Sequence, residues 1–204
     1  MFDGLKAAAH SVRGDEFLHT ENWDSAIAEY TEAIRLDPNQ WDCYAKRGLV
    51  YYHKKNYDSA IADLTQGFRN GLGGTDSASS YFLRGCAFYD KNAWDSAIAD
   101  FTQAIRLNPN NAGWYGYRGN AHYNKNDYDS AVADYTQAIR LDPNTAVYKA
   151  SLTHAKAALA SSVAVDDDWD AVDAPAGALK ICTSCGASLA AGLKFCTSCG
   201  AKIG

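Results

Sequence analysis

Long apolar runs are missing from this sequence of 204 residues, and even stretches such as Leu49–Tyr52 end after a few positions. A membrane-spanning helix needs about 20 consecutive apolar residues, so the sequence excludes a membrane protein. The first residues include Asp3 and no apolar run before His10, which is not the layout of a secretory signal. We therefore expect a cytoplasmic chain whose cysteine thiols stay reduced.

An excess of basic residues is also missing. The sequence has 19 Lys and Arg against 24 Asp and Glu, a formal net charge of -5. Nucleic-acid-binding domains usually carry a basic excess or stripe, so nucleic acid is disfavoured as the main partner. With 47% hydrophobic residues, the chain has enough apolar side chains for the cores of one or two globular domains.

Catalytic motifs are absent as well. The sequence has no glycine-rich phosphate loop, no Gly-x-Ser-x-Gly nucleophile turn and no His-Glu-x-x-His zinc motif. Its five histidines are scattered, and no carboxylate or nucleophile is predictable beside them. We expect that the protein is not an enzyme.

One short string occurs four times along the chain. Trp-Asp-Ser-Ala-Ile-Ala begins at Trp23, and identical or nearly identical strings begin at Tyr57, Trp94 and Tyr128, with spacings of 34, 37 and 34 residues. A fixed period in this range indicates stacked repeats of one supersecondary unit. When the prolines at 38, 109 and 143 are taken as closing turns, the units are residues 7–40, 41–74, 78–111 and 112–145, with residues 75–77 as an extra three.

Each unit resembles the tetratricopeptide repeat (TPR) family at specific positions. Small residues stand at positions 8 and 20 of every unit, namely Gly14, Gly48, Gly85 and Gly119, then Ala26, Ala60, Ala97 and Ala131. Position 24 carries large residues: Tyr30, Leu64, Phe101 and Tyr135. The resemblance implies an all-α fold, a right-handed superhelical solenoid of four helix-turn-helix units. A capping helix over residues 146–161 is predicted to cover the last unit and to complete a TPR domain of residues 1–162.

In this family the first helix of each unit, helix A, lines a concave groove. Carried over by position, the resemblance implies a peptide-binding groove that includes Lys46, Leu49, Tyr52, His53, Phe82, Leu83, Tyr89, Tyr117, Asn120, Tyr123 and Asn124. This surface is aromatic and sparsely charged, so it favours an apolar or amphipathic peptide or protein segment. The alternative interpretation is that several of these tyrosines only cover contacts between helices.

One ligand class of the family is disfavoured by the groove residues. Members that capture the carboxylate tails of chaperones carry Lys, Asn and Arg at set positions of three successive units. Here those positions hold residues such as Ser11, Asp15 and Leu83. We therefore expect a ligand that is not a chaperone C-terminal tail.

A second pattern places a base and an acid in every unit. Position 7 holds Arg13, Arg47, Arg84 and Arg118, and position 23 holds Glu29, Asp63, Asp100 and Asp134. Helix pairing puts these positions at similar heights, so a ladder of ion pairs is predicted, with direct ligand contact as the alternative. His10 and His122 occupy apolar positions of the repeat, and we interpret both as structural residues.

The composition changes after Ser162. Residues 163–179 are acidic, contain Pro175 and Gly177 and have no helical or strand period, which predicts a flexible linker. Trp169 stands alone in an acidic run within it. One hypothesis is that this tryptophan folds back over the aromatic groove, and the alternative is a solvated linker.

The most specific chemical signal follows the linker. Cys182-Thr-Ser-Cys185-Gly and Cys196-Thr-Ser-Cys199-Gly offer four thiolates, a donor set that suits tetrahedral Zn²⁺. Residues 180–204 resemble the short zinc-ribbon family, whose cysteine pairs sit on small β-hairpins, and this implies one structural zinc ion. A disulfide interpretation is disfavoured in a reducing compartment. Cys43 and Cys86 fall within repeat helices and are interpreted as small semi-buried thiols.

These patterns together predict a non-enzymatic scaffold or adaptor for protein–protein interaction. The TPR groove would bind a peptide or protein, and the zinc ribbon would be a second docking module. The alternative is a nucleic-acid-associated accessory factor in transcription or translation that acts through the ribbon. The N-terminal end of the stack, which shows no separate capping helix in the sequence, is a candidate surface for weak self-association.

Overall fold

Helices dominate the structure, a computed structural model that describes residues 2–71, 74–165, 180–181 and 188–189. The chain divides into two compact units, Met1–Lys156 and Ala157–Gly204, and each is described by itself. Among the described residues, no helix combines the length and the apolar character needed to cross a membrane.

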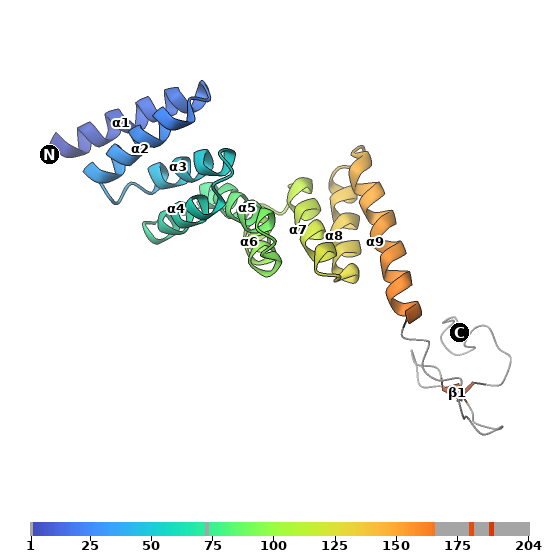
Figure 1. Ribbon diagram of the computed structural model, residues 1–204. Coiled ribbons are helices and arrows are strands. Elements are labelled where there is room, and N and C mark those ends of the chain that lie inside the picture. Colours follow the sequence, from blue (N-terminus) through green and yellow to red (C-terminus); the bar gives the residue numbers. More distant parts are fainter. Residues whose placement is uncertain (1, 72–73, 166–179, 182–187, 190–204) are drawn as a thin grey trace. The chain divides into compact units, whose positions relative to one another are not determined.

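Within the described residues, eight helices of the first unit form four consecutive pairs, and a ninth helix follows them (Figure 1). The pairs are α1 (Phe2–His19) with α2 (Trp23–Leu36), α3 (Trp41–His53) with α4 (Tyr57–Arg69), α5 (Gly74–Asp90) with α6 (Trp94–Leu107) and α7 (Ala112–Asn124) with α8 (Tyr128–Leu141). The ninth helix is α9 (Ala146–Val165). The prediction of a helical TPR solenoid is confirmed over these residues. The odd-numbered helices up to α7 are the A helices of the repeats, and the even-numbered ones are the B helices.

The turn inside each pair has one geometry throughout. The second residue after the end of helix A adopts a left-handed backbone, at Glu21, Lys55, Asn92 and Asn126 with φ of 55°, 58°, 59° and 63°. The next residue is the N-cap of helix B, and in three repeats its side chain accepts a hydrogen bond from the serine backbone N–H three residues later, as Asn22 does from Ser25. Such N-caps satisfy donors that the first helical turn leaves free. The serine of the recurring Asp-Ser string is therefore the residue whose backbone N–H is bound by the N-cap side chain in these three repeats.

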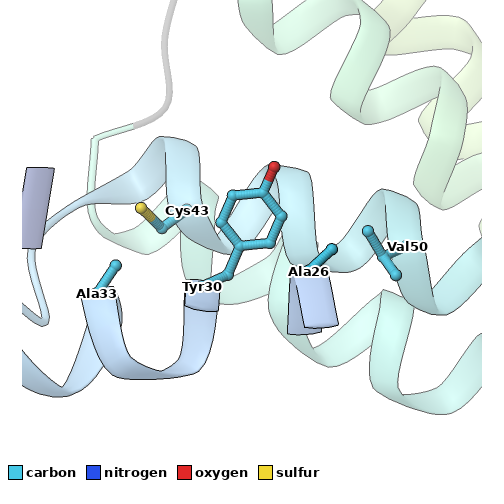
Figure 2. Packing of buried hydrophobic residues seen from close by; sticks show 5 residues of the cluster. All are labelled: Ala26, Tyr30, Ala33, Cys43 and Val50. Carbon is cyan, nitrogen blue, oxygen red and sulfur yellow. The ribbon is translucent and has the colours of Figure 1, made fainter. Parts of the chain in front are cut away.

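Contact between positions 8 and 24 forms the centre of each repeat. A Cβ atom at Gly14 would lie 2.5 Å from Tyr30, and one at Gly85 would lie 2.7 Å from Phe101. In the first repeat, Tyr30 of α2 packs with residues of α2 and α3 in a buried cluster (Figure 2), which comprises Ala26, Tyr30, Ala33, Cys43 and Val50. Because B helices contact the A helix of the next repeat in this way, each unit buries part of its apolar surface against its neighbour.

Helix α9 packs against the last repeat. Leu152 and Ala155 pack against a cluster that includes Ala131 and Tyr135 of α8. The helix continues to Val165, beyond the predicted end at residue 161 and into the predicted linker. Residues 163–165, Val-Ala-Val, carry neither proline nor glycine, so no helix-breaking residue stops it there.

Two helices begin outside the predicted repeat bounds. Helix α5 begins at Gly74, so residues 75–77, the extra three residues of the sequence pattern, belong to the first part of this helix. No proline stands between Gly74 and Asp90 to end the helix earlier. Helix α1 likewise begins at Phe2, ahead of the predicted start of the first unit at residue 7.

The second unit contributes two short strands to the described residues. Strand β1 (Lys180–Ile181) pairs antiparallel with β2 (Ser188–Leu189), with Lys180 opposite Leu189 and Ile181 opposite Ser188. The four cysteines of the predicted zinc ribbon, Trp169 and most of the predicted linker lie outside the described residues. The zinc ribbon and the docking of Trp169 therefore stay predictions.

Candidate functional site

The predicted groove residues lie on three successive A helices. Helix α3 carries Lys46, Leu49, Tyr52 and His53, α5 carries Phe82, Leu83 and Tyr89, and α7 carries Tyr117, Asn120, Tyr123 and Asn124. Helix α5 contacts both α3 and α7. Helices α3, α5 and α7 are therefore neighbours, and the groove residues they carry stay a prediction.

Several of these side chains contact one another across neighbouring A helices. The hydroxyl of Tyr52 donates a hydrogen bond to Asp90 at 3.0 Å, which joins α3 to α5. The amide of Asn124 donates to the hydroxyl of Tyr89 at 2.9 Å, which joins α7 to α5. The ring of Tyr117 lies edge-on to the ring of Phe82, with a centroid distance of 5.1 Å. The aromatic part of the groove is thus a connected layer.

Part of the aromatic layer serves contacts inside the repeats. The aromatic residue that begins each helix B packs against a groove tyrosine of the same repeat, with centroid distances of 5.7 Å for Tyr52–Tyr57, 4.9 Å for Tyr89–Trp94 and 5.3 Å for Tyr123–Tyr128. These three tyrosines are half-buried, whereas Tyr117 is 42% exposed. Tyr117 is therefore the groove tyrosine best placed to meet a ligand, and the other three also cover helix contacts.

The described residues line cavities between neighbouring helices of the solenoid. The α1–α3 cavity, about 520 Å³, is lined by Ala8, Ser11, Val12, Asp15, Asn39, Gln40, Trp41, Asp42 and Lys46. The α5–α7 cavity, about 280 Å³, is lined by Ala78, Ser79, Leu107, Asn108, Asn111 and Trp114. The α7–α9 cavity, about 210 Å³, is lined by Gly113, Gly116, Tyr117, Asn120, Tyr135, Val147, Tyr148 and Ser151. Only Lys46, Tyr117 and Asn120 of these residues belong to the predicted groove set.

Family positions alone could not reveal the residues that complete these cavities. Trp41 begins α3 and Tyr148 lies on the capping helix, and neither occupies a groove position of the repeat. Gly113 and Gly116 of α7 line the α7–α9 cavity, and the ring of Tyr148 lies so near Gly116 that a Cβ there would be 2.7 Å from it. The glycine pair near the start of α7 was the one available signal in the sequence.

The α1–α3 cavity is the charged one. Lys46 Nζ lies 2.9 Å from Asp15 Oδ2 and 3.5 Å from Asp42 Oδ2. Burial acts to lower the pKa of Lys46, but the hydrogen bonds to Asp15 and Asp42 and the negative charges of these two carboxylates together outweigh it, so the pKa is raised. Tyr30 donates to the other oxygen of Asp15 at 2.8 Å, and burial together with this bond raises the pKa of its phenol. Lys46 therefore stays protonated and is neutralised by acids of its own surroundings.

The predicted arginine ladder is present as ion pairs. Arg47 donates two hydrogen bonds to Asp63, at 2.7 and 2.8 Å, and a third to Thr31 of the preceding helix B at 2.9 Å. Arg84 and Arg118 repeat this arrangement in the following units. Because these guanidinium groups are engaged in pairs with largely buried carboxylates, the ion-pair interpretation is confirmed for these three repeats. Direct ligand contact is not their role in this arrangement.

The two histidines in apolar positions also have structural partners. His10 Nδ1 lies 2.7 Å from Glu29, beside the more exposed Arg13 of the first ladder step. His122 Nδ1 lies 2.9 Å from Asp127, which caps α8. Among the described residues, no group of three or more His, Cys, Asp or Glu side chains is arranged to hold a metal ion. Both histidines are satisfied by carboxylates, in agreement with the structural interpretation.

The two cysteines of the repeats are buried free thiols. Cys86 is 4% exposed, and burial raises the pKa of its thiol to about 12. The thiolate is the reactive form of cysteine, so this side chain is unreactive near neutral pH. Its contribution is packing within the aromatic layer, next to Phe101 and Ala97.

Comparison with known families agrees with this geometry. Models described as tetratricopeptide repeat or TPR repeat match residues 14–55, 42–69 and 82–146. These ranges span more than half of the chain and include parts of all four repeats. The chain belongs to the tetratricopeptide repeat family, whose repeats form scaffolds for protein–protein interaction. No curated protein sequence matches the chain.

Solved structures show the same fold at low sequence identity. The MamA protein has a TM-score of 0.70 at 23% identity, with 84% of this chain and 100% of that chain covered. YrrB, described as a TPR protein with an unusual peptide-binding site, has a TM-score of 0.67 at 18% identity, with 78% and 86% covered. MamA from Desulfovibrio magneticus RS-1, residue 41 to the end, has a TM-score of 0.66 at 14% identity, with 81% and 98% covered. At these identities the likeness concerns the fold.

Proposed function

We propose that the protein is a cytoplasmic adaptor that binds a peptide segment of a partner protein along the surface of its A helices. The observation that carries this proposal is the series of cavities that the described residues line between α1 and α3, between α5 and α7, and between α7 and α9. A ligand in extended or helical form can place successive side chains into such a series. The description of YrrB as a peptide-binding TPR protein supports a ligand of this kind.

The chemistry of the surface favours an apolar or amphipathic segment. Tyr117 and Val147 are 42% and 67% exposed at the rim of the α7–α9 cavity, where they can cover apolar side chains of a ligand. A free carboxylate tail fits poorly, because Lys46 already pairs with Asp15 and Asp42. Binding of this kind requires no catalytic group in the groove.

Photo-crosslinking of the full-length protein tests the groove directly. A benzophenone amino acid replaces Tyr117 in one variant and Ala99, an exposed residue of the B helix α6, in the control variant. In cells we expect a crosslinked partner polypeptide from position 117 and none of the same mass from position 99. Equal crosslinking from both positions would place the partner elsewhere and overturn the groove proposal.

We further propose that Cys182, Cys185, Cys196 and Cys199 hold one Zn²⁺ and that this ion stabilises residues 180–204 as a second docking module. Support comes from the donor set, since four thiolates in two Cys-x-x-Cys pairs match a closed structural zinc site. Strand β1 ends just before Cys182, and β2 lies between the two cysteine pairs in sequence. Their antiparallel pairing is compatible with cysteine pairs carried by short hairpins. With four protein ligands the metal would support the fold and leave no position for a substrate.

Native mass spectrometry of the protein expressed in cytosol tests the zinc proposal. The expected mass exceeds that of the apo chain by one zinc ion, and the Cys182→Ser variant loses this increment. Cys86→Ser is the matched control and retains the metal, because Cys86 lies in α5. A metal-free chain lighter than the reduced mass by two or four hydrogens would indicate disulfides and overturn the proposal.

A further inference from the structure

The α1–α3 cavity differs from the other two in its charge. Asp15, Asp42 and Lys46 line it, so its formal charge is -1 with all three groups ionised. The linings of the α5–α7 and α7–α9 cavities contain no Asp, Glu, Lys or Arg in the described part of the chain. From this difference we propose that the α1–α3 cavity binds a lysine or arginine side chain of the peptide partner. The inference rests on the proposed peptide-binding function and specifies its ligand.

Asp42 is the carboxylate best able to accept the incoming cation. Its side chain is 41% exposed, and the distance of 3.5 Å to Lys46 leaves room for a shorter bond to a second donor. Asp15 is more fully engaged, since one of its oxygens accepts from Tyr30 at 2.8 Å and the other from Lys46 at 2.9 Å. A guanidinium or ammonium group that meets Asp42 would form a charge-assisted hydrogen bond at the cavity wall.

The uncharged lining suits the rest of a basic side chain. Trp41 adjoins Asp42 in sequence and lines the same cavity, so its ring is available for a cation–π contact. Ala8 and Val12 of α1 provide an apolar wall, and Val12 is 58% exposed. Lysine and arginine commonly bury their methylene stems against such a wall while the charged end meets an acid. The cavity therefore offers a partner for each part of the side chain.

The same residues argue against an anionic ligand. Lys46 is the cation of the lining, and it is placed between two carboxylates. An acidic side chain entering the cavity would approach Asp15 and Asp42 as well as Lys46, so repulsion exceeds attraction. A basic and an acidic ligand therefore lead to opposite expectations for the substitution Lys46→Gln. Lys46→Gln should strengthen the binding of a basic peptide, whereas it should abolish binding if Lys46 captures an acid.

The location of the charge also orients the ligand. The basic side chain is expected toward α1 and α3, and uncharged side chains are expected toward the α5–α7 and α7–α9 cavities. A segment with a basic residue near one end and apolar residues toward the other would match this order. Specificity would then arise from the difference in charge between the α1–α3 cavity and the α5–α7 and α7–α9 cavities.

A peptide selection with the full-length protein tests the inference. A library of random nonapeptides, acetylated and amidated to remove terminal charges, is equilibrated with the protein, and the retained peptides are sequenced. We expect enrichment of Lys or Arg at one position. A retained peptide is then labelled, and its dissociation constant is measured by fluorescence anisotropy beside versions that carry Gln or Glu in place of the basic residue.

Three variants complete the test. Asp42→Asn should weaken binding of the basic peptide by roughly two- to fivefold, the range for a partly exposed ion pair, and leave the Gln version unchanged. Lys46→Gln should tighten binding of the basic peptide. Asp129→Asn, which removes an exposed carboxylate of α8 away from the cavity, is the matched control and should change neither.

The outcomes separate this inference from the proposed function. Retained peptides without a basic preference, or tight binding of the Glu version that Lys46→Gln abolishes, would overturn the charge assignment and leave peptide binding intact. Failure to retain any peptide, together with failure of the crosslink from position 117, would overturn both. Enrichment of basic residues that Asp42→Asn reverses supports the assignment.

Discussion

Arg84 and Asp100 form a two-pronged ion pair between α5 and α6. The guanidinium Nε and Nη2 donate to the two carboxylate oxygens at 2.7 and 2.8 Å, and Nη1 donates to Thr65 of α4 at 3.0 Å. One side chain thus joins three helices from two repeats. The guanidinium also lies 4.6 Å from the centre of the Phe68 ring. This arrangement makes the arginine a contact within a repeat and between repeats at once.

Replacement of Arg84 by Leu should destabilise the protein strongly. Asp100 is 5% exposed and would be left as a buried carboxylate without its cation. Removal of one member of a buried pair costs about 3–5 kcal/mol, and we expect the free energy of unfolding in urea to fall by about 3 kcal/mol. Arg106→Leu, in the exposed part of α6, is the control and should change it by less than about 0.5 kcal/mol. Unchanged stability of the Arg84 variant together with lost ligand binding would contradict the ladder.

Gly85→Ala and Gly4→Ala should have effects of opposite sign. Both glycines lie in helices, where alanine is normally favoured by about 1 kcal/mol. At Gly85 the new Cβ would lie 2.7 Å from the buried ring of Phe101, whereas at Gly4 it would meet nothing within 4 Å. Overpacking costs about 1–3 kcal/mol, so Gly85→Ala should lower the free energy of unfolding, whereas Gly4→Ala should raise it. Equal effects in chemical denaturation would refute the close approach of α5 and α6.

A second ladder of ion pairs is expected to contribute little. Lys54 pairs with Asp24, Lys91 with Asp58 and Lys125 with Asp95, each between successive repeats. Asp58 is 80% exposed, so Asp58→Asn should cost less than about 1 kcal/mol and even less in 1 M salt. Asp100→Asn removes a buried carboxylate and serves as the comparison, and it should lower the free energy of unfolding several times more than Asp58→Asn does. Urea unfolding at low and high salt measures both, and a salt-independent loss at Asp58 would show that its surroundings are not solvent.

High pH should destabilise the fold in part through Tyr135. Burial raises the pKa of its phenol to about 12, compared with about 10 for an exposed tyrosine. Because the unfolded state releases this proton first, the stability that the phenol contributes is complete below about pH 10 and is lost as the pH rises toward 12. The free energy of unfolding should therefore decline less steeply with pH in Tyr135→Phe than in the unaltered protein. Parallel declines between pH 9 and 11.5 would exclude this contribution.

The sequence predicted the repeat architecture because its periodic residues act locally and in pairs. Glycine at position 8 and a large residue at position 24 are visible as a pattern, and the structure places them in contact, as Gly85 and Phe101 show. The alternation of Arg and Asp was predictable for the same reason. The third partner, Thr65, belongs to the preceding repeat and carried no recognisable signal of its own.

The candidate site was only partly predictable. Family positions identified the A-helix surface, but they could not show that Tyr52, Tyr89 and Tyr123 also pack against the aromatic residue of helix B. They also missed Trp41 and Tyr148, which line cavities from outside the regular groove positions.

The amino-acid sequence by itself determined the number of repeats, their helix-turn-helix form and the identity of the core positions, since these follow from a period and from the sizes of recurring side chains. Only the tertiary structure decided where the repeats leave cavities and how their charges are paired. Lys46 looks like a free groove cation in the sequence, and in the fold it lies between Asp15 and Asp42. The physical reason is that cavities and charge balance depend on side chains from different repeats, whose distances are set by the packing of one helix pair on the next.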